Sequence, residues 1–263
     1  MSSAMAASLM ANHALATTGT WTGGGSNGTW SNTANWSGGT VPGSFSGPPY
    51  TNSDIALFNS TQTNNTVEND SNLNIDEIYF DTASAGTYNI GANGSGDNPL
   101  IMTDGGLIEI DSTVTSGTDF IYAPLVIQGA NLTLEDNSTN TATGLAGSTG
   151  GISGGVAEAA TLTLDGNNNS GSNQSNSTIN GLITNGSATS LSLVVNDSSA
   201  TGVWELNPST SNKVLIFPAL IGLCCKRRTD RIASVSPTSG GLPACRKRDA
   251  SEFRAVKLLS DPT

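Results

Sequence analysis

The chain has 263 residues, of which 36% are hydrophobic, 5% are aromatic and 31 are glycine. So few apolar side chains cannot fill a wide globular interior. They can fill a narrow one, because each coil of a solenoid needs only a few inward side chains. The composition therefore favours an elongated fold. Short β-branched and leucine runs recur between the polar stretches, which argues against disorder of the whole chain.

Charge divides the chain into two unlike parts. Residues 1–212 contain 17 of the 21 acidic residues and no lysine or arginine. Residues 213–263 contain all ten basic residues, four acidic residues and all three cysteines. The formal charges, −17 and +6, add to the net −11. The acidic part repels phosphates and anionic lipids, so we expect no nucleic-acid partner.

Residues 1–16 are similar to the end of a signal peptide. The segment MSSAMAASLMANHALA is rich in alanine and methionine, and it ends in the small-x-small pattern Ala14-Leu15-Ala16. No basic residue precedes the apolar stretch, and Asn12 and His13 interrupt it. The prediction is an exported protein, because the following body also lacks cysteine. The alternative is a disordered terminus.

Residues 17–60 contain three of the four tryptophans, Trp21, Trp30 and Trp36. Terminal coils of a solenoid must close an apolar end, so these residues predict an N-terminal cap followed by the first strand, Asp54–Phe58. An aromatic platform on which sugars stack is the functional alternative. The cap is the preferred interpretation, because tryptophan in a small polar segment usually forms its core.

Residues 61–208 predict an all-β fold without amphipathic helices. Short apolar runs alternate with clusters of Gly, Asn, Asp and Ser about every ten residues. The predicted strands in the first part of this region are Leu73–Phe80, Thr87–Ile90, Leu100–Met102, Leu107–Ile110, Phe120–Ile127 and Leu132–Leu134.

A longer repeat favours a solenoid over a sandwich. Leu132–Leu134, Leu162–Leu164 and Leu191–Leu193 recur about every 30 residues, the second interval being one position shorter than the first. Gly151–Gly155 and Gly181–Gly186 recur at the longer of these two intervals. Leucines facing inward and small residues turning the corners predict a right-handed parallel β-helix, or β-solenoid, over residues 61–208.

Three groups of residues resemble the autotransporter-associated β-strand repeat proteins, a family of large secreted and surface proteins of Gram-negative and related bacteria. They are the opening WTGGGSNGTWSNTANW with Gly38, Gly39, Val41 and Pro42, the strand Asp54–Phe58, and the Gly-Ile-Ser-Gly-Gly and Leu-Thr-Leu-Asp-Gly units. The family repeat continues into a strand, for which Gly202–Leu206 stands here. Its usual Asn-Thr-Tyr-x-Gly-Gly-Thr turn is replaced by Asn207–Thr210. The resemblance covers roughly three quarters of the chain and implies an N-terminal fragment of a passenger-like protein at the cell surface or outer membrane.

Residues 209–263 form a divergent basic tail, predicted to be disordered or non-native. An apolar run, Val214–Cys225, precedes Lys226-Arg227-Arg228, as in a membrane anchor. Twelve residues interrupted by Pro218 are too few for a span of about twenty, so no transmembrane span is predicted. A segment from another reading frame, or a misjoined region, would explain the simultaneous change in charge, cysteine and glycine content. An anchor and a separate basic domain are the alternatives.

The sequence predicts no catalytic residues. His13 is the only histidine, and it lies in the signal-like segment, so no nucleophile of the mature body has an imidazole partner. A β-helix lyase needs a basic residue, which the body lacks. A hydrolase needs clustered carboxylates, and the densest group is Asp70, Asp76, Glu77 and Asp81. Their alternation with apolar residues is typical of the solvent face of a strand.

No cofactor or metal site is predicted from motifs. Gly23–Gly28 fits GxGxxG by letter, but tryptophans flank it and no strand and helix surround it, so we expect a turn. Asp70–Asn74 begins like a calcium loop, but Ile75 stands where glycine is needed and Asp81 where a bidentate Glu is usual. Loose calcium binding by the acidic surface is the remaining expectation.

These features lead to a non-enzymatic, exported structural or adhesive protein at the cell surface or outside the cell. Its partners would be glycans, extracellular matrix or other cells, held by many weak contacts. A polysaccharide-acting hydrolase on the same fold is the first alternative. A non-functional fragment of a larger surface-protein gene is the second.

Overall fold

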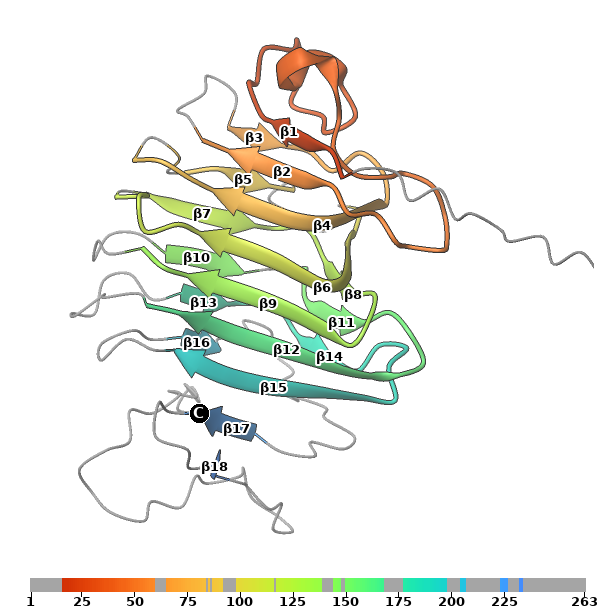
Figure 1. Ribbon diagram of the computed structural model, residues 1–263, viewed down its shortest axis with the longest axis vertical. Coiled ribbons are helices and arrows are strands. Elements are labelled where there is room, and N and C mark those ends of the chain that lie inside the picture. Colours follow the sequence, from red (N-terminus) through yellow and green to blue (C-terminus); the bar gives the residue numbers. More distant parts are fainter. Residues whose placement is uncertain are drawn as a thin grey trace, which may run out of the picture.

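The computed structural model describes residues 16–59, 65–83, 85, 87–91, 98–115, 117–138, 144–147, 150–167, 177–197, 204–206, 223–226 and 232–233. In these residues the chain winds into coils whose strands stack in parallel along one long axis (Figure 1). This confirms the predicted all-β solenoid. The only helices in this part of the chain are two short 3-10 helices, η1 (Thr33–Asn35) and η2 (Ser37–Gly39).

The strands form three faces, which we call the long, middle and short faces. The long face contains β1 (Thr18–Thr20), β2 (Ile55–Phe58), the second halves of β4 (Leu73–Phe80) and β6 (Leu100–Ile110), then β9 (Asn131–Asp136), β12 (Ala159–Gly166) and β15 (Ser190–Asp197). The middle face contains the first halves of β4 and β6, then β8 (Leu125–Ile127), β11 (Ile152–Gly154) and β14 (Ile183–Thr184). The short face contains β3 (Thr66–Val67), β5 (Asn89–Ile90), β7 (Thr118–Ile121), β10 (Gly144–Gly147), β13 (Ser177–Ile179) and β16 (Trp204–Leu206).

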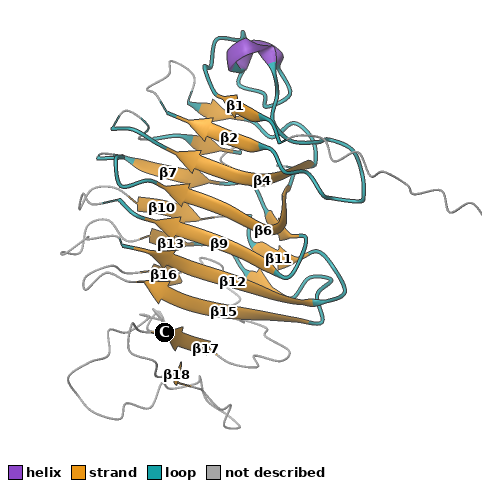
Figure 2. Cartoon of the chain, in the orientation of Figure 1, coloured by secondary structure: helices purple, strands orange, loops and turns teal. Residues whose placement is uncertain are grey.

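Coils in the second half of the stack contribute one strand to each face, as β10, β11 and β12 do, with loops at the corners (Figure 2). Side chains along the strands alternate between inside and outside, as in β12, where Ala160, Leu162 and Leu164 are buried. The inward side chains form one continuous hydrophobic core from Trp21 to Leu206. A narrow interior therefore suffices for this apolar-poor chain.

Two strand predictions need correction at the corners of the coils. The predicted strands Leu100–Met102 and Leu107–Ile110 are one strand, β6, because Gly105 bends the backbone at φ 84° without ending the strand. The predicted strand Phe120–Ile127 is two strands, β7 and β8, because the chain turns a corner before Leu125.

The predicted repeat register is also wrong by small steps. Leu162 pairs with Leu132, as predicted, but on its other side it pairs with Leu193 and not with Leu191. Ile152 pairs with Ile183 and not with Leu182, the residue that the glycine pattern aligned with it. A shift of one residue would turn Ile183 outward and the exposed Leu182 inward, so burial of the isoleucine decides the register.

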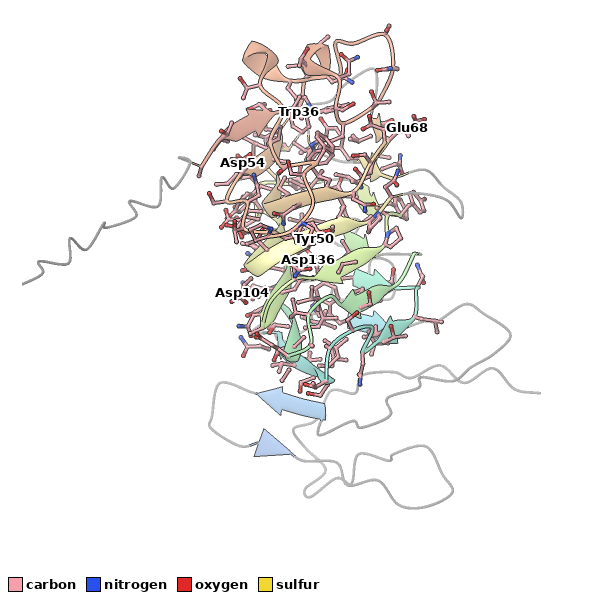
Figure 3. The ribbon with its side chains drawn as sticks, turned by 90° about the vertical axis from the view of Figure 1, so that its right-hand side faces the viewer. Trp36, Tyr50, Asp54, Glu68, Asp104 and Asp136 are labelled. Carbon is pink, nitrogen blue, oxygen red and sulfur yellow. The ribbon has the colours of Figure 1, made fainter. Side chains whose placement is uncertain are left out.

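The tryptophan-rich segment lies at the N-terminal end of the stack, where Figure 3 labels Trp36 near the helical turns. Trp21, Trp30 and Trp36 are 0–2% exposed, and their rings contact one another and Phe58 at centroid distances of 5.0–6.1 Å. Buried rings offer no platform for sugars. In the described residues the first strand is β1, which pairs with β2, so Asp54–Phe58 contains the second of these strands and not the first.

Beyond residue 208, the structure describes two strands. β17 (Leu223–Lys226) pairs in parallel with β15, and β18 (Ile232–Ala233) pairs antiparallel with β17. The rest of the predicted basic tail, and the signal-like segment up to residue 15, lie outside the described residues.

Candidate functional site

The four carboxylates that form the densest acidic group in the sequence, Asp70, Asp76, Glu77 and Asp81, do not converge on one point. They follow one another along the segment before β4, the strand itself and the residue after it. A strand rises about 3.3 Å per residue, so Asp76 and Asp81 are separated by about 16 Å. Asp70 accepts hydrogen bonds from the backbone and hydroxyl of Ser31 and ties the tryptophan segment to the stack. Asp81 accepts a hydrogen bond from the hydroxyl of Thr113 at 2.9 Å. These two carboxylates have structural partners.

Asp76 and Glu77 lie side by side where β4 passes from the middle to the long face. The pairing with β6 shifts between Ile75 and Glu77, so the expected alternation of acids with apolar residues is broken here. Burial raises the pKa of the Asp76 carboxyl above its ordinary value, and the nearby charge of Glu77 raises it further. Residues Leu73–Phe80 are extended strand, so the segment from Asp70 does not form a calcium-binding loop.

The structure instead lines up acidic residues across neighbouring coils of the long face. One outward register position is occupied in successive strands by Tyr79, Glu109, Glu135, Asp165 and Asn196. We call Glu109, Glu135 and Asp165 the carboxylate row. Strands in a sheet are about 4.8 Å apart, so each carboxylate has the next as its direct neighbour.

Asparagine side chains hold the carboxylate row in place. The Asn137 amide nitrogen donates to Oε1 of Glu109 at 2.9 Å and to Oε1 of Glu135 at 2.7 Å. The Asn196 amide nitrogen donates to Oδ2 of Asp165 at 2.8 Å. These amides supply the donors that lysine or arginine would supply in a less acidic chain.

Burial raises the pKa of the Glu109 carboxyl. The hydrogen bond from Asn137 lowers it, and the charges of Glu135, Asp111 and Glu77 raise it. Burial also raises the pKa of the Tyr79 hydroxyl, and a hydrogen bond with Glu77 raises it further. The outer long face is thus a surface on which carboxylates are crowded, and their mutual repulsion adds to the rise in the pKa of Glu109.

The described residues contain no group of three or more His, Cys, Asp or Glu side chains that could hold a metal ion. The carboxylates in the row stand side by side along the stack rather than around a common point. Gly23–Gly28 forms bends in the tryptophan segment, where the Gly25 backbone donates to Oδ1 of Asn35 at 2.8 Å, so it is not a dinucleotide-binding loop.

A second acidic group lies inside the solenoid, and sequence reasoning missed it. Asp119 on β7 and Asp136 at the end of β9 are both fully buried. Asp136 accepts hydrogen bonds from the backbone of Ser138 at 3.0 Å, from its hydroxyl at 2.6 Å and from the hydroxyl of Ser177. Oδ1 of Asp119 accepts a hydrogen bond from the Tyr88 backbone at 2.8 Å, whereas its Oδ2 has no hydrogen-bond partner.

Burial raises the pKa of Asp119 to about 8, against the backbone hydrogen bonds of Tyr88 and Thr87, and the charge of Asp136 adds to the rise. Asp119 is therefore mostly protonated at neutral pH. The period-2 pattern of β7 places Asp119 inward, and this was the signal in the sequence that could have revealed it.

These features define a parallel β-solenoid with a packed interior and an acidic outer face. No protein-family model, no curated protein and no solved structure matches the chain. None of the helices in the described residues has the length and apolar character needed to cross a membrane.

Proposed function

We propose that this chain is a non-enzymatic, exported structural or adhesive β-solenoid of the autotransporter-passenger type. The observation that carries the proposal is the unbroken alignment of outward side chains across β9, β12 and β15. Asn131, Thr161 and Ser192 occupy one outward row, and Thr133 and Thr163 occupy the next, which Val194 continues in β15. Repeated polar groups at the strand spacing offer many equivalent weak contacts, which suits multivalent attachment.

The interior supports the same proposal. Inward side chains fill it along its length, and the largest of them are less than 2% exposed. Partners must therefore bind to the outer faces. The acidic composition of those faces favours neutral glycans or divalent cations over anionic partners.

Surface location tests the proposal directly. Cells that express the full chain with an epitope tag should lose the tag when intact cells are treated with protease, and they should aggregate or attach more than cells without it. A cytoplasmic marker protein should stay intact in the same cells. Full protection of the tag in intact cells, with digestion only after lysis, would contradict export.

A polysaccharide hydrolase is the second candidate, and the carboxylate row is the observation that favours it. Glu109 and Glu135 are direct neighbours on adjacent strands, close to the separation of about 5 Å found in retaining glycosidases. The raised pKa of Glu109 suits a general acid. Against it, one amide, that of Asn137, holds both carboxylates.

Measurement of new reducing ends on polysaccharides separates the two candidates. The adhesive proposal predicts none from the wild-type chain. The hydrolase predicts release that falls by about a thousandfold or more in Glu109→Gln and Glu135→Gln and is unchanged in Thr163→Ala, a control on the same face.

A further inference from the structure

An aromatic pair faces outward on the short face. In β7 and the residue after it, Asp119 and Ile121 are buried, so Phe120 and Tyr122 point to the other side of the sheet. Their rings are stacked, with centroids 5.4 Å apart and planes 4° from parallel. Both side chains are half-buried. The pair therefore presents an ordered aromatic surface on the outside of the stack.

The neighbours of this pair are small or polar. The register position of Phe120 is occupied in the other strands of the short face by Thr66, Asn89, Ala146, Thr178 and Glu205. Among these described positions, Phe120 is the only aromatic residue. β7 lies within the face, between β5 and β10, so the rings do not serve to cover an end of the sheet (Figure 1).

The core does not need these rings. The inward aromatic side chains of the early coils, Phe58, Phe80 and Tyr88, already contact one another at centroid distances of 4.9–6.1 Å. Phe120 and Tyr122 are on the opposite side of the sheet from them. An outward position surrounded by threonine and asparagine would ordinarily hold another polar residue.

We propose that the Phe120–Tyr122 pair is a stacking site for a neutral glycan. The flat C–H face of a pyranose ring packs on an aromatic face, and in this stacked pair each ring keeps one face that the other ring does not cover. Asn89 and Thr118 flank Phe120 on the outer side, and their amide and hydroxyl groups can both donate to and accept from sugar hydroxyls. No lysine or arginine occurs before Lys213, so acidic sugars would find no cation here.

This inference rests on the proposed adhesive function and adds to it a binding site, the Phe120–Tyr122 pair, and a ligand, a neutral glycan. The test is affinity electrophoresis of the purified full chain in native gels that contain hydroxyethylcellulose, a neutral β-linked glucan. The wild-type chain should be retarded, and the apparent dissociation constant should increase about tenfold or more in Phe120→Ser and in Tyr122→Ser. Polygalacturonate, an acidic polymer, should retard the wild-type chain less.

Two further variants keep the test interpretable. Phe45→Ser removes an exposed aromatic side chain from a loop elsewhere and should leave retardation unchanged. Tyr122→Phe keeps the aromatic ring, so this variant should be retarded as strongly as the wild-type chain. It can be measured even if a serine variant is unstable. Equal retardation of wild type and folded serine variants would overturn the proposal. If the wild-type chain is not retarded, the proposal is also overturned. Attachment of intact cells would then show that the protein is adhesive without a glycan site at this pair.

Discussion

At the residue scale, the interior changes character along the stack. Its N-terminal part is aromatic, with the tryptophans, Phe58 and Phe80 in mutual contact. Further along, at the register position of Phe58 and Phe80, the inward residue is Asp136. A buried carboxylate is tolerated when it is hydrogen-bonded, and the donors around Asp136 meet that condition. Asp119 has one oxygen without a partner, so burial favours its neutral, protonated form and raises its pKa.

The buried Asp119 carboxyl should make the folded protein less stable as the pH rises from about 4 to about 8. Its pKa is about 8 in the folded protein, against 3.8 ordinarily, so between these values the folded state holds a proton that the unfolded chain has lost. The contribution of this carboxyl to stability is present below about pH 4 and is lost as the pH rises through about 8. Each pKa unit corresponds to about 1.4 kcal/mol, or a few degrees in melting temperature.

The melting temperature of Asp119→Asn should therefore fall less between pH 5 and pH 9 than that of the wild-type chain. The amide keeps the acceptor for the Tyr88 backbone and cannot ionise. Thermal unfolding followed by circular dichroism across this range measures the difference. Parallel pH profiles of the two proteins would show that Asp119 does not carry the effect.

At the element scale, the sequence predicted where strands lie better than it predicted which residues pair between neighbouring strands. β4 spans Leu73–Phe80 as predicted, because its apolar residues are bounded by turn residues on both sides. The carboxylate row was not predictable, because it depends on which residues pair. Glu109 pairs with Glu135, and Glu135 pairs with Asp165. The coil from Glu109 to Glu135 therefore contains fewer residues than the coil from Glu135 to Asp165. The number of residues in a coil depends on the length of its corner loops, and no periodic pattern in the sequence predicts that number.

The last residue of β12 gives a test of coil stacking. Gly166 has φ 132°, and a Cβ atom there would collide with the Asp136 backbone on the coil before it. Gly166→Ala should therefore destabilise the chain by about 3 kcal/mol, or about 10 °C in melting temperature. Gly47→Ala is the control, because a Cβ atom at Gly47 meets nothing within 4 Å. A similar melting temperature for both variants would contradict the close approach of these coils.

At the scale of the whole molecule, the outer faces bear many acidic groups, and the body up to residue 212 has no lysine or arginine that could pair with them. Divalent cations that bind this surface more strongly when it is folded should stabilise it. We expect millimolar calcium to raise the melting temperature of the full chain by a few degrees relative to sodium at equal ionic strength. Glu135→Gln should reduce the increase. An unchanged melting temperature in calcium would count against cation binding by the carboxylate row.

In the described residues the coils stack in register, so one whole coil should be removable. Leu132 pairs with Leu162, so deletion of residues 133–162 joins Leu132 to Thr163 and keeps the alternation of inward and outward side chains. The deletion also removes Asp136 together with Ser138, so this buried carboxylate is not left without its donor. Deletion of residues 133–161, one residue shorter, shifts the joined strand by one position and reverses its faces.

The most direct measurement is thermal unfolding of these two deletion proteins beside the full chain, followed by far-ultraviolet circular dichroism. We predict that the protein lacking 133–162 keeps a β-sheet spectrum and a cooperative transition at a somewhat lower temperature, since only one coil and one interface are lost. The protein lacking 133–161 should lose the cooperative transition. Equal behaviour of the two deletions would contradict the stacked, register-matched solenoid.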